Sequence, residues 1–257
     1  MDGGLSRITD ALDCRMTWRV PPYDRAADEV VAYVRDRYDP VGIIISGSIV
    51  RGEAGPASDL DVVVVHDQPW RLRDQRRFEG VPCEIFVNPA SKIRDYFASE
   101  HADGEPTMAH MFATGEPIEP VPAIIHELVA EARGWLARPI EVTDDMLVQR
   151  RYGACDRLDD ARDAIDRDPA IAAVLLGAVV RDVIAYAFVQ RRMFQPRRKR
   201  AVEALAAIDP DAAALVRAWS MAKGKDALVI VEHLARHVLG DDTFFEWTSP
   251  RDPVRIV

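Results

Sequence analysis

Asp59 and Asp61 stand one residue apart, and Asp61 directly precedes the apolar run 62–65. In a β-strand, residues two apart point to the same face and lie roughly 6.5–7 Å apart. Two carboxylates so placed repel each other and resist burial, whereas a divalent cation between them removes both penalties. Carboxylate oxygens are ligands that suit Mg²⁺. The spacing therefore predicts a rigid magnesium site on Asp59 and Asp61.

A Gly-Ser pair, Gly47 and Ser48, follows the apolar run 41–46, where we expect a strand to end and a helix to begin. The start of a helix offers free backbone N–H groups and the positive end of a dipole, which favour phosphate. Glycine lets the backbone approach closely, the serine hydroxyl adds a donor, and Arg51 lies one turn further on. We therefore predict an anion-binding turn; the alternative is an ordinary tight turn.

Glu84 is a third acidic candidate, and it lies in the apolar segment VPCEIFVN at 81–88. If this segment is a strand beside 60–66, Glu84 joins the two aspartates around one site. A carboxylate there is placed to take a proton from an attacking hydroxyl or to hold a second metal ion. The alternative is a glutamate on an edge strand that faces water.

The segment 191–200 is the one concentrated basic stretch that we identify, with six Arg or Lys in ten residues. One interpretation is a solvated corner between helices. The other is that Lys199 reaches a triphosphate bound at the Gly47-Ser48 turn and stabilises the pyrophosphate that leaves. Lys223 and Lys225 are weaker candidates for the same role.

The remaining polar groups give weaker signals. Four aspartates at helical spacing form either a solvated face or a lining for a cationic or polyhydroxyl acceptor: Asp156, Asp159, Asp160 and Asp163. The histidines at 66, 101, 110, 126, 233 and 237 show no metal-ligand spacing near the acids. The cysteines lack paired spacing and are predicted to be reduced, with no zinc site or disulfide; they are Cys14, Cys83 and Cys155.

The elements that must position these residues change character along the chain. Up to about residue 90 the pattern mixes one helix with strands: 23–38 is helical, 41–46 and 60–66 are strands, and 70–88 forms a hairpin. After that we find helical patterns: 89–102, 106–114, 123–137, 143–167, 169–194, 198–207, 210–221 and 224–239. The predicted class is α+β, a small mixed sheet with helices followed by an all-α helical bundle. Prolines at 117, 120 and 122 place the boundary between domains 1–117 and 118–257.

Composition limits the function classes. The chain has 257 residues, 48% of them hydrophobic, and a net charge of -9. These values indicate a globular protein and argue against a protein that coats nucleic acid. The first twenty residues lack the apolar core of a signal peptide, and the apolar run 170–180 stops at Arg181, short of a bilayer's width. We therefore predict a cytoplasmic protein with no membrane partner.

The combined motif resembles the signature of the DNA polymerase beta-like nucleotidyltransferase superfamily, and its spacer is similar to that of minimal bacterial members. The motif consists of Gly47-Ser48, a spacer with Arg51 and Gly52, and then Ser58-Asp59-Leu60-Asp61. The resemblance implies that the two aspartates bind magnesium together with a nucleoside triphosphate. It also implies that Gly47 and Ser48 cradle the β and γ phosphates, helped by Ser58.

The helical half makes the chain similar to the aminoglycoside nucleotidyltransferases. Glu84 matches the third acidic position, which is the general base in the streptomycin-modifying relatives, whereas the kanamycin-modifying relatives take their base from the helical half. The segment 188–205 is similar to one in related helical domains, with Phe194 where relatives often have Trp and Lys199 at a lysine position.

These features together predict transfer of a nucleoside monophosphate, AMP from ATP, to a hydroxyl of a small-molecule acceptor such as an aminoglycoside-like antibiotic. One alternative is an enzyme that adenylylates a protein, for instance a toxin partner. Another is a non-catalytic regulator that binds nucleotide or RNA; the complete set of acids argues against this one. The sequence leaves open the preferred nucleotide, the acceptor and the oligomeric state.

Overall fold

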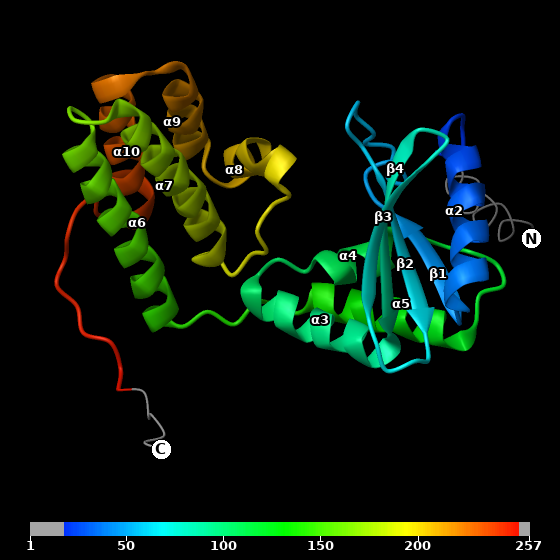
Figure 1. Ribbon diagram of the computed structural model, residues 1–257. Helices are drawn as coiled ribbons and strands as arrows, with labels where there is room; N and C mark the ends of the chain where they lie inside the picture. The colour runs from blue at the N-terminus through cyan, green and yellow to red at the C-terminus, as the bar shows by residue number, and fades with distance from the viewer. Residues whose placement is uncertain (1–17, 252–257) are drawn as a thin grey trace, which may run out of the picture. The chain divides into compact units, whose positions relative to one another are not determined.

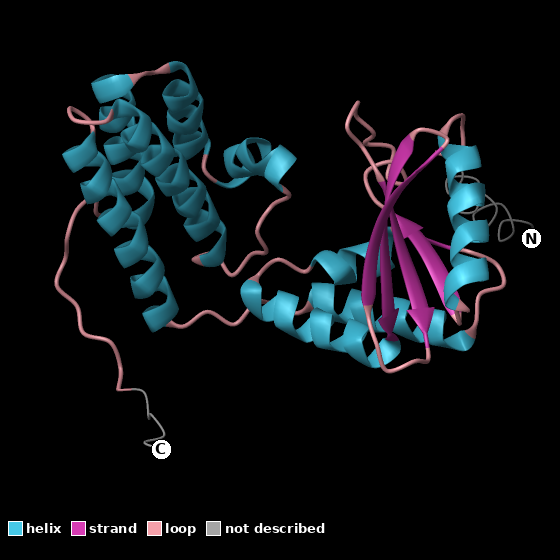
Figure 2. Ribbon diagram, viewed as in Figure 1, coloured by secondary structure: helices cyan, strands magenta, loops and turns pink. Residues whose placement is uncertain are grey.

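The structure is a computed structural model that describes residues 18–251. Cys14 lies outside these residues, as does most of the segment in which no signal peptide was expected. The described residues form two compact units, and the boundary in the chain lies between Arg138 and Pro139. Strands occur in the first unit, and the second contains helices alone, as predicted (Figures 1 and 2).

The first unit contains a five-stranded mixed sheet with the order β3-β4-β2-β1-β5. The two central strands β2 and β4 run parallel, and the other neighbours run antiparallel. Parallel neighbours need a crossover, and here the chain passes from β2 to β4 through β3, which lies on the outer side of β4. The strands are β1 (Gly42–Ser46), β2 (Leu60–His66), β3 (Leu72–Phe78), β4 (Val81–Pro89) and β5 (Glu116–Pro117).

Helices cover both faces of this sheet, which explains the unbroken valine run in β2. Helix α2 (Tyr23–Tyr38) packs on one face, where Leu60, Val62 and Val64 point. Val63 and Val65 point to the other face, which is covered by α3 (Ala90–Asp103), α4 (Thr107–Thr114) and α5 (Ala123–Ala137) (Figure 1). A strand buried on both faces reads as a continuous apolar run and not as an alternation.

Helix α5 belongs to the first unit, although the sequence boundary at 117/118 placed it in the second domain. Its buried face contributes Ile125, Leu128 and Ala132 to the core that also holds Phe97 and Phe112. The change from strands to helices therefore marks the end of the sheet and not the end of the compact unit. An amphipathic helix packs its apolar face on an uncovered apolar surface. The residue pattern of the helix does not show whether that surface belongs to the sheet or to the helical bundle.

The second unit is a helical bundle with its own core. Asp168 and Asp209 cap the starts of two helices by accepting backbone N–H hydrogen bonds. The elements are α6 (Asp144–Ala164), α7 (Pro169–Val189), the 3-10 turn η1 (Arg198–Arg200), α8 (Ala201–Ile208), α9 (Pro210–Met221) and α10 (Gly224–Leu239).

Helix α7 continues past Arg181 and is the one described helix that is long and apolar enough to cross a membrane by length and composition. Of its most apolar stretch, 44% is buried inside the structure, and α7 packs against α6 and α10. Its Leu176, Val179 and Val183 lie in the bundle core. The same composition therefore fits the central helix of this bundle.

Candidate active site

Three carboxylates meet on one face of the sheet. Asp59, Asp61 and Glu84 each offer an oxygen, and these oxygens lie within 4.8 Å of one another. The parallel register of β2 and β4 places Asp61 directly beside Glu84. Asp59 comes just before β2, two residues from Asp61. The structure thus brings together the three acids that the sequence singled out, on an interior strand pair and not on an edge.

The acids belong to a polar row that crosses four strands. Ser46 on β1 pairs with Asp61, Asp61 pairs with Glu84, and Glu84 pairs with Gln75 on β3. Directly paired residues project to the same face of a sheet, so all four side chains share one face. Ser46 is 1% exposed, and its hydroxyl has no hydrogen-bond partner among the described residues. This end of the sheet therefore concentrates polar groups where strands normally bury apolar ones.

Strand β3 holds the Glu84 carboxylate from its outer side. Arg73 Nη2 donates to Glu84 Oε2 at 2.6 Å, and Gln75 Nε2 donates to Glu84 Oε1. The Arg73 guanidinium also lies over the Phe86 ring, 4.7 Å from its centroid. The sequence pattern predicted the hairpin but singled out neither residue, because only the pairing of its two strands brings them to Glu84. The signal that identifies them is the register of the hairpin, which follows from its two-residue turn Glu79-Gly80.

The acid cluster is electrostatically strained without a cation. Burial raises the pKa of Asp61 to about 6, and the negative charges of Asp59 and Glu84 add to this effect. The positive charges of Arg51 and Arg73 act in the opposite direction. Three half-buried carboxylates within reach of one ion form an all-oxygen donor set that suits a hard divalent cation such as Mg²⁺. The residues present therefore fit the metal that the sequence predicted.

The turn after β1 differs from the prediction in one respect. No helix begins at Ser48; residues 48–52 form turns, closed by the Gly52 N–H to the Ile49 carbonyl at 3.0 Å and the Glu53 N–H to the Ser48 carbonyl at 2.8 Å. Gly52 has φ +71°, a left-handed conformation that ends the turn before a helix can grow. The helix-dipole argument for phosphate binding therefore does not apply here.

Gly47 lies so close to the acids that a side chain would be crowded there. Its φ is +105°, and an added Cβ would lie 3.1 Å from both the Asp59 carbonyl oxygen and Asp61 Oδ2. Only glycine adopts this conformation without strain. The sequence argument that glycine allows close approach of the backbone thus has a direct structural basis, although what approaches is the acid cluster of the chain itself.

The two serines of the motif meet across the loop between β1 and β2. Ser48 Oγ and Ser58 Oγ are 2.8 Å apart, and Ser58 Oγ accepts from the Gly55 N–H at 2.8 Å. Arg51 pairs with Glu53 at 3.1 Å, and its charge acts on Asp61. The loop therefore gathers two hydroxyls and one guanidinium near the carboxylates.

The other candidates lie elsewhere in the chain. Lys199 belongs to η1 in the second unit, and its role at the triphosphate stays a prediction. Asp159 accepts hydrogen bonds from Arg162, Thr243 Oγ1 and the Phe244 N–H, so it serves to attach the segment after α10 to α6. Among residues 18–251, the three acids described above are the one group of His, Cys, Asp or Glu found to have metal-ligand geometry.

A mixed sheet that carries three convergent carboxylates is typical of metal-dependent nucleotidyltransferases. Residues 27–98 match the family described as "Nucleotidyltransferase domain". The first unit therefore contains a polymerase beta-like nucleotidyltransferase domain, as the motif predicted, and an all-helical region follows it.

A solved structure, the nucleotidyltransferase-like protein from Exiguobacterium sibiricum, is similar to this chain with 12% sequence identity and a TM-score of 0.51. The match covers 85% of this chain and 74% of that one. At this identity the likeness shows the fold alone, and it extends into the helical region. No curated protein matches the chain. The similarity to aminoglycoside nucleotidyltransferases therefore stays a prediction.

Proposed function

We propose that the protein transfers a nucleoside monophosphate, AMP from ATP, to a hydroxyl group of a small-molecule acceptor. The observation that carries this proposal is the convergence of Asp59, Asp61 and Glu84 on one face of a nucleotidyltransferase domain. Aminoglycoside-like antibiotics are one class of acceptor, because they present several hydroxyls. We further propose that the protein acts in the cytoplasm, which its buried free thiols at Cys83 and Cys155 support.

Each residue of the site has a distinct part in the proposed reaction. Asp59 and Asp61 hold the Mg²⁺ ion, which when bound supplies positive charge against the charge that develops on the transferred phosphoryl group. With the Ser58 hydroxyl donating to Ser48 Oγ, the Ser48 hydroxyl donates to the outer phosphates. The acceptor oxygen forms a bond to the α-phosphorus, the bond from that phosphorus to pyrophosphate breaks, and Glu84 takes the acceptor's proton.

The hydrogen bonds to Glu84 fix the position of its carboxylate in the proposed reaction. Arg73 and Gln75 occupy one oxygen each and hold the carboxylate on the side of β3, while Asp61 lies on its other side. A base must be fixed within hydrogen-bond reach of the proton that it removes. To take the proton, one Glu84 oxygen must lose its present hydrogen bond and accept one from the acceptor hydroxyl. The bond from the neutral Gln75 amide is weaker than the bond from the charged Arg73, so Oε1 is the oxygen that takes the proton.

The test uses the full chain, Mg²⁺ and each of the four α-³²P-labelled nucleotides with a panel of aminoglycosides, other polyhydroxyl compounds and a cell extract. We expect label from ATP on a small molecule, and its loss in Asp61→Asn. Asp95→Asn is the matched control, because Asp95 is an exposed carboxylate on α3. Label on a protein in the extract would support the protein-adenylylating alternative instead. Absence of transfer under every condition would overturn the proposal.

A further inference from the structure

Strand β3 forms one edge of the sheet, and its outer backbone groups point away from β4. The hairpin of β3 and β4 closes with the two-residue turn Glu79-Gly80, where both φ angles are positive at 48° and 79°. In such a hairpin the pair next to the turn, Phe78 and Val81, is hydrogen-bonded. The next pair is not, and the two kinds of pair then alternate along the strands. The N–H and C=O groups of Arg73, Gln75 and Arg77 therefore face outward.

Two further observations agree with this assignment. The residue opposite Arg77 is Pro82, which has no N–H to give to β3. No other described strand pairs with β3 on its outer side. Among residues 18–251, the sheet thus leaves one row of alternating backbone donors and acceptors at this edge.

The edge is basic, although the chain as a whole is acidic. The segment RLRDQRRF at 71–78 holds four arginines and one acid in a chain whose net charge is -9. The one acid, Asp74, is occupied within the fold: its Oδ2 accepts from Tyr33 Oη at 2.8 Å, Tyr38 Oη at 2.9 Å and Arg76 Nε at 3.0 Å. The charge that this edge presents to a partner is therefore positive.

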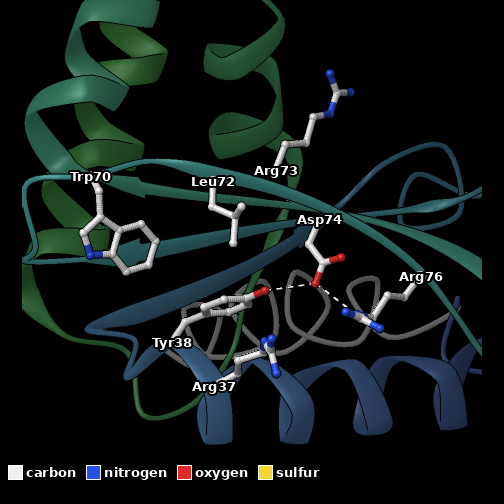
Figure 3. A pocket seen from close by; sticks show the side chains of 7 residues that line it. All are labelled: Arg37, Tyr38, Trp70, Leu72, Arg73, Asp74 and Arg76. Carbon is white, nitrogen blue, oxygen red and sulfur yellow. Dashed lines mark hydrogen bonds and ion pairs between the residues drawn. The ribbon is translucent and has the colours of Figure 1, made fainter.

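An open pocket of about 510 Å³ lies between the edge and the end of α2. Trp70 and Leu72, each 42% exposed, and Tyr38 give it an apolar surface, while Arg37 and Arg76 lie along it and Arg73 turns to the opposite side of the strand (Figure 3). Trp70 and Leu72 thus place exposed apolar surface beside the charged side chains of the pocket. The pocket is wide enough for one large apolar side chain.

We propose that the edge of β3 binds an extended, acidic peptide segment of a partner protein as an additional strand. The backbone row pairs with the peptide backbone, and one apolar side chain of the peptide enters the pocket at Trp70 and Leu72. The peptide's carboxylates pair with Arg71 and Arg77, whose partners within the fold are the neutral Tyr96 hydroxyl and Gly80 carbonyl, whereas Arg73 and Arg76 already pair with Glu84 and Asp74. Strand addition takes affinity from backbone hydrogen bonds and specificity from alternate side chains. The proposal does not depend on the transferase activity.

The chemistry of this edge favours a peptide over two other occupants. A single-stranded nucleic acid would use the arginines and Trp70, but its phosphates would face the outward carbonyl groups of β3. A second copy of β3 would place arginines against arginines. An acidic peptide strand satisfies the donors, the acceptors and the positive charge together.

The probe is a fluorescein-labelled peptide of alternating Glu and Val with one central Leu, and its binding to the full chain is followed by fluorescence anisotropy. We expect saturable binding that weakens at least tenfold when alternate peptide nitrogens are methylated. The protein variant Arg77→Pro removes one outward N–H and leaves the inward ladder intact, a change that edge strands tolerate. The matched control Arg77→Gln keeps the backbone N–H. Like Arg77→Pro, it removes the charge and the hydrogen bond from Arg77 Nη1 to the Gly80 carbonyl.

We expect Arg77→Pro to bind at least tenfold more weakly than Arg77→Gln, with both variants showing the circular dichroism spectrum of the parent. If Arg77→Pro does not fold, the methylated peptide still tests the backbone pairing. Equal binding of the methylated and unmethylated peptides would overturn the proposal, because charge alone would then explain the affinity. Tighter binding of a single-stranded oligonucleotide, or absence of saturable peptide binding, would overturn it as well.

Discussion

Replacing Asp61 by Asn should stabilise the metal-free protein, because ionisation of the Asp61 carboxylate lowers the stability of the folded state. Burial, followed by the charges of Asp59 and Glu84, raises its pKa from 3.8 to about 6. The folded state thus binds this proton more tightly than the unfolded chain does. The cost is absent below about pH 4, grows as the pH rises from 4 to 6, and is fully present above that range.

The size of the effect follows from the shift of the pKa. The difference between about 6 and 3.8 is roughly 2.2 pH units. At about 1.4 kcal/mol per unit, this corresponds to about 3 kcal/mol in the free energy of unfolding at pH 8. The same linkage relation gives about half of that value near pH 5. Asp61→Asn should therefore be more stable than the parent by these amounts in EDTA.

The assay is calorimetric and chemical unfolding in EDTA from pH 5 to pH 8, with each transition followed separately because the chain has two units. Adding Mg²⁺ at pH 8 should stabilise the parent and leave the variant unchanged. Asp95→Asn, which alters an exposed carboxylate, should change stability by no more than about 0.5 kcal/mol at either pH. A variant no more stable than the parent at pH 8, or an advantage that does not shrink toward pH 5, would refute the electrostatic reasoning.

Three further substitutions test the same end of the sheet. Gly47→Ala should lower the free energy of unfolding by about 1–3 kcal/mol, because its φ is +105° and the new Cβ would crowd Asp61; Gly55→Ala, in open space, should not, and thermal unfolding compares the two. Ser46→Ala should raise the stability of the metal-free protein by about 1 kcal/mol, since it removes a buried hydroxyl without a partner; a loss in urea titrations would show that water satisfies this group. Glu84→Gln should slow nucleotide transfer about 100-fold or more and leave nucleotide affinity nearly unchanged, and an unaltered rate in single-turnover assays would remove Glu84 from its role.

The sequence predicted the parts of the fold that depend on local pattern. The valine run of β2 and the apolar spacing of α2 identify buried elements, because hydrophobic periodicity is a local property. The adjacency of Asp61 and Glu84 could be predicted only on the assumption that their two strands lie side by side, because the sequence does not show which strands pair. Arg73 and Gln75 were missed for the same reason: only the register of the edge strand brings them to Glu84.

The turn after β1 shows a different limit. A strand that ends in Gly-Ser is often followed by a helix, but here Gly52 ends the turn after a few residues. The membership of α5 likewise depends on which apolar surface is free once the sheet has formed. Neither outcome is encoded in a short window of residues, because both are decided by contacts between segments that are distant in the chain.

Three features that each destabilise the folded protein lie together at the acid cluster. Asp61 is a carboxylate at the end of a buried strand, Gly47 has a left-handed backbone conformation against it, and the Ser46 hydroxyl beside it is buried without a partner. Asp159 in the helical unit is also acidic, but it accepts hydrogen bonds from Arg162, the Thr243 hydroxyl and the Phe244 N–H. Destabilising features of this kind are expected at functional sites, where a bound ligand supplies the missing interactions. The contrast between Asp61 and Asp159 therefore separates an acid cluster whose geometry fits a cation from a charge that serves the fold.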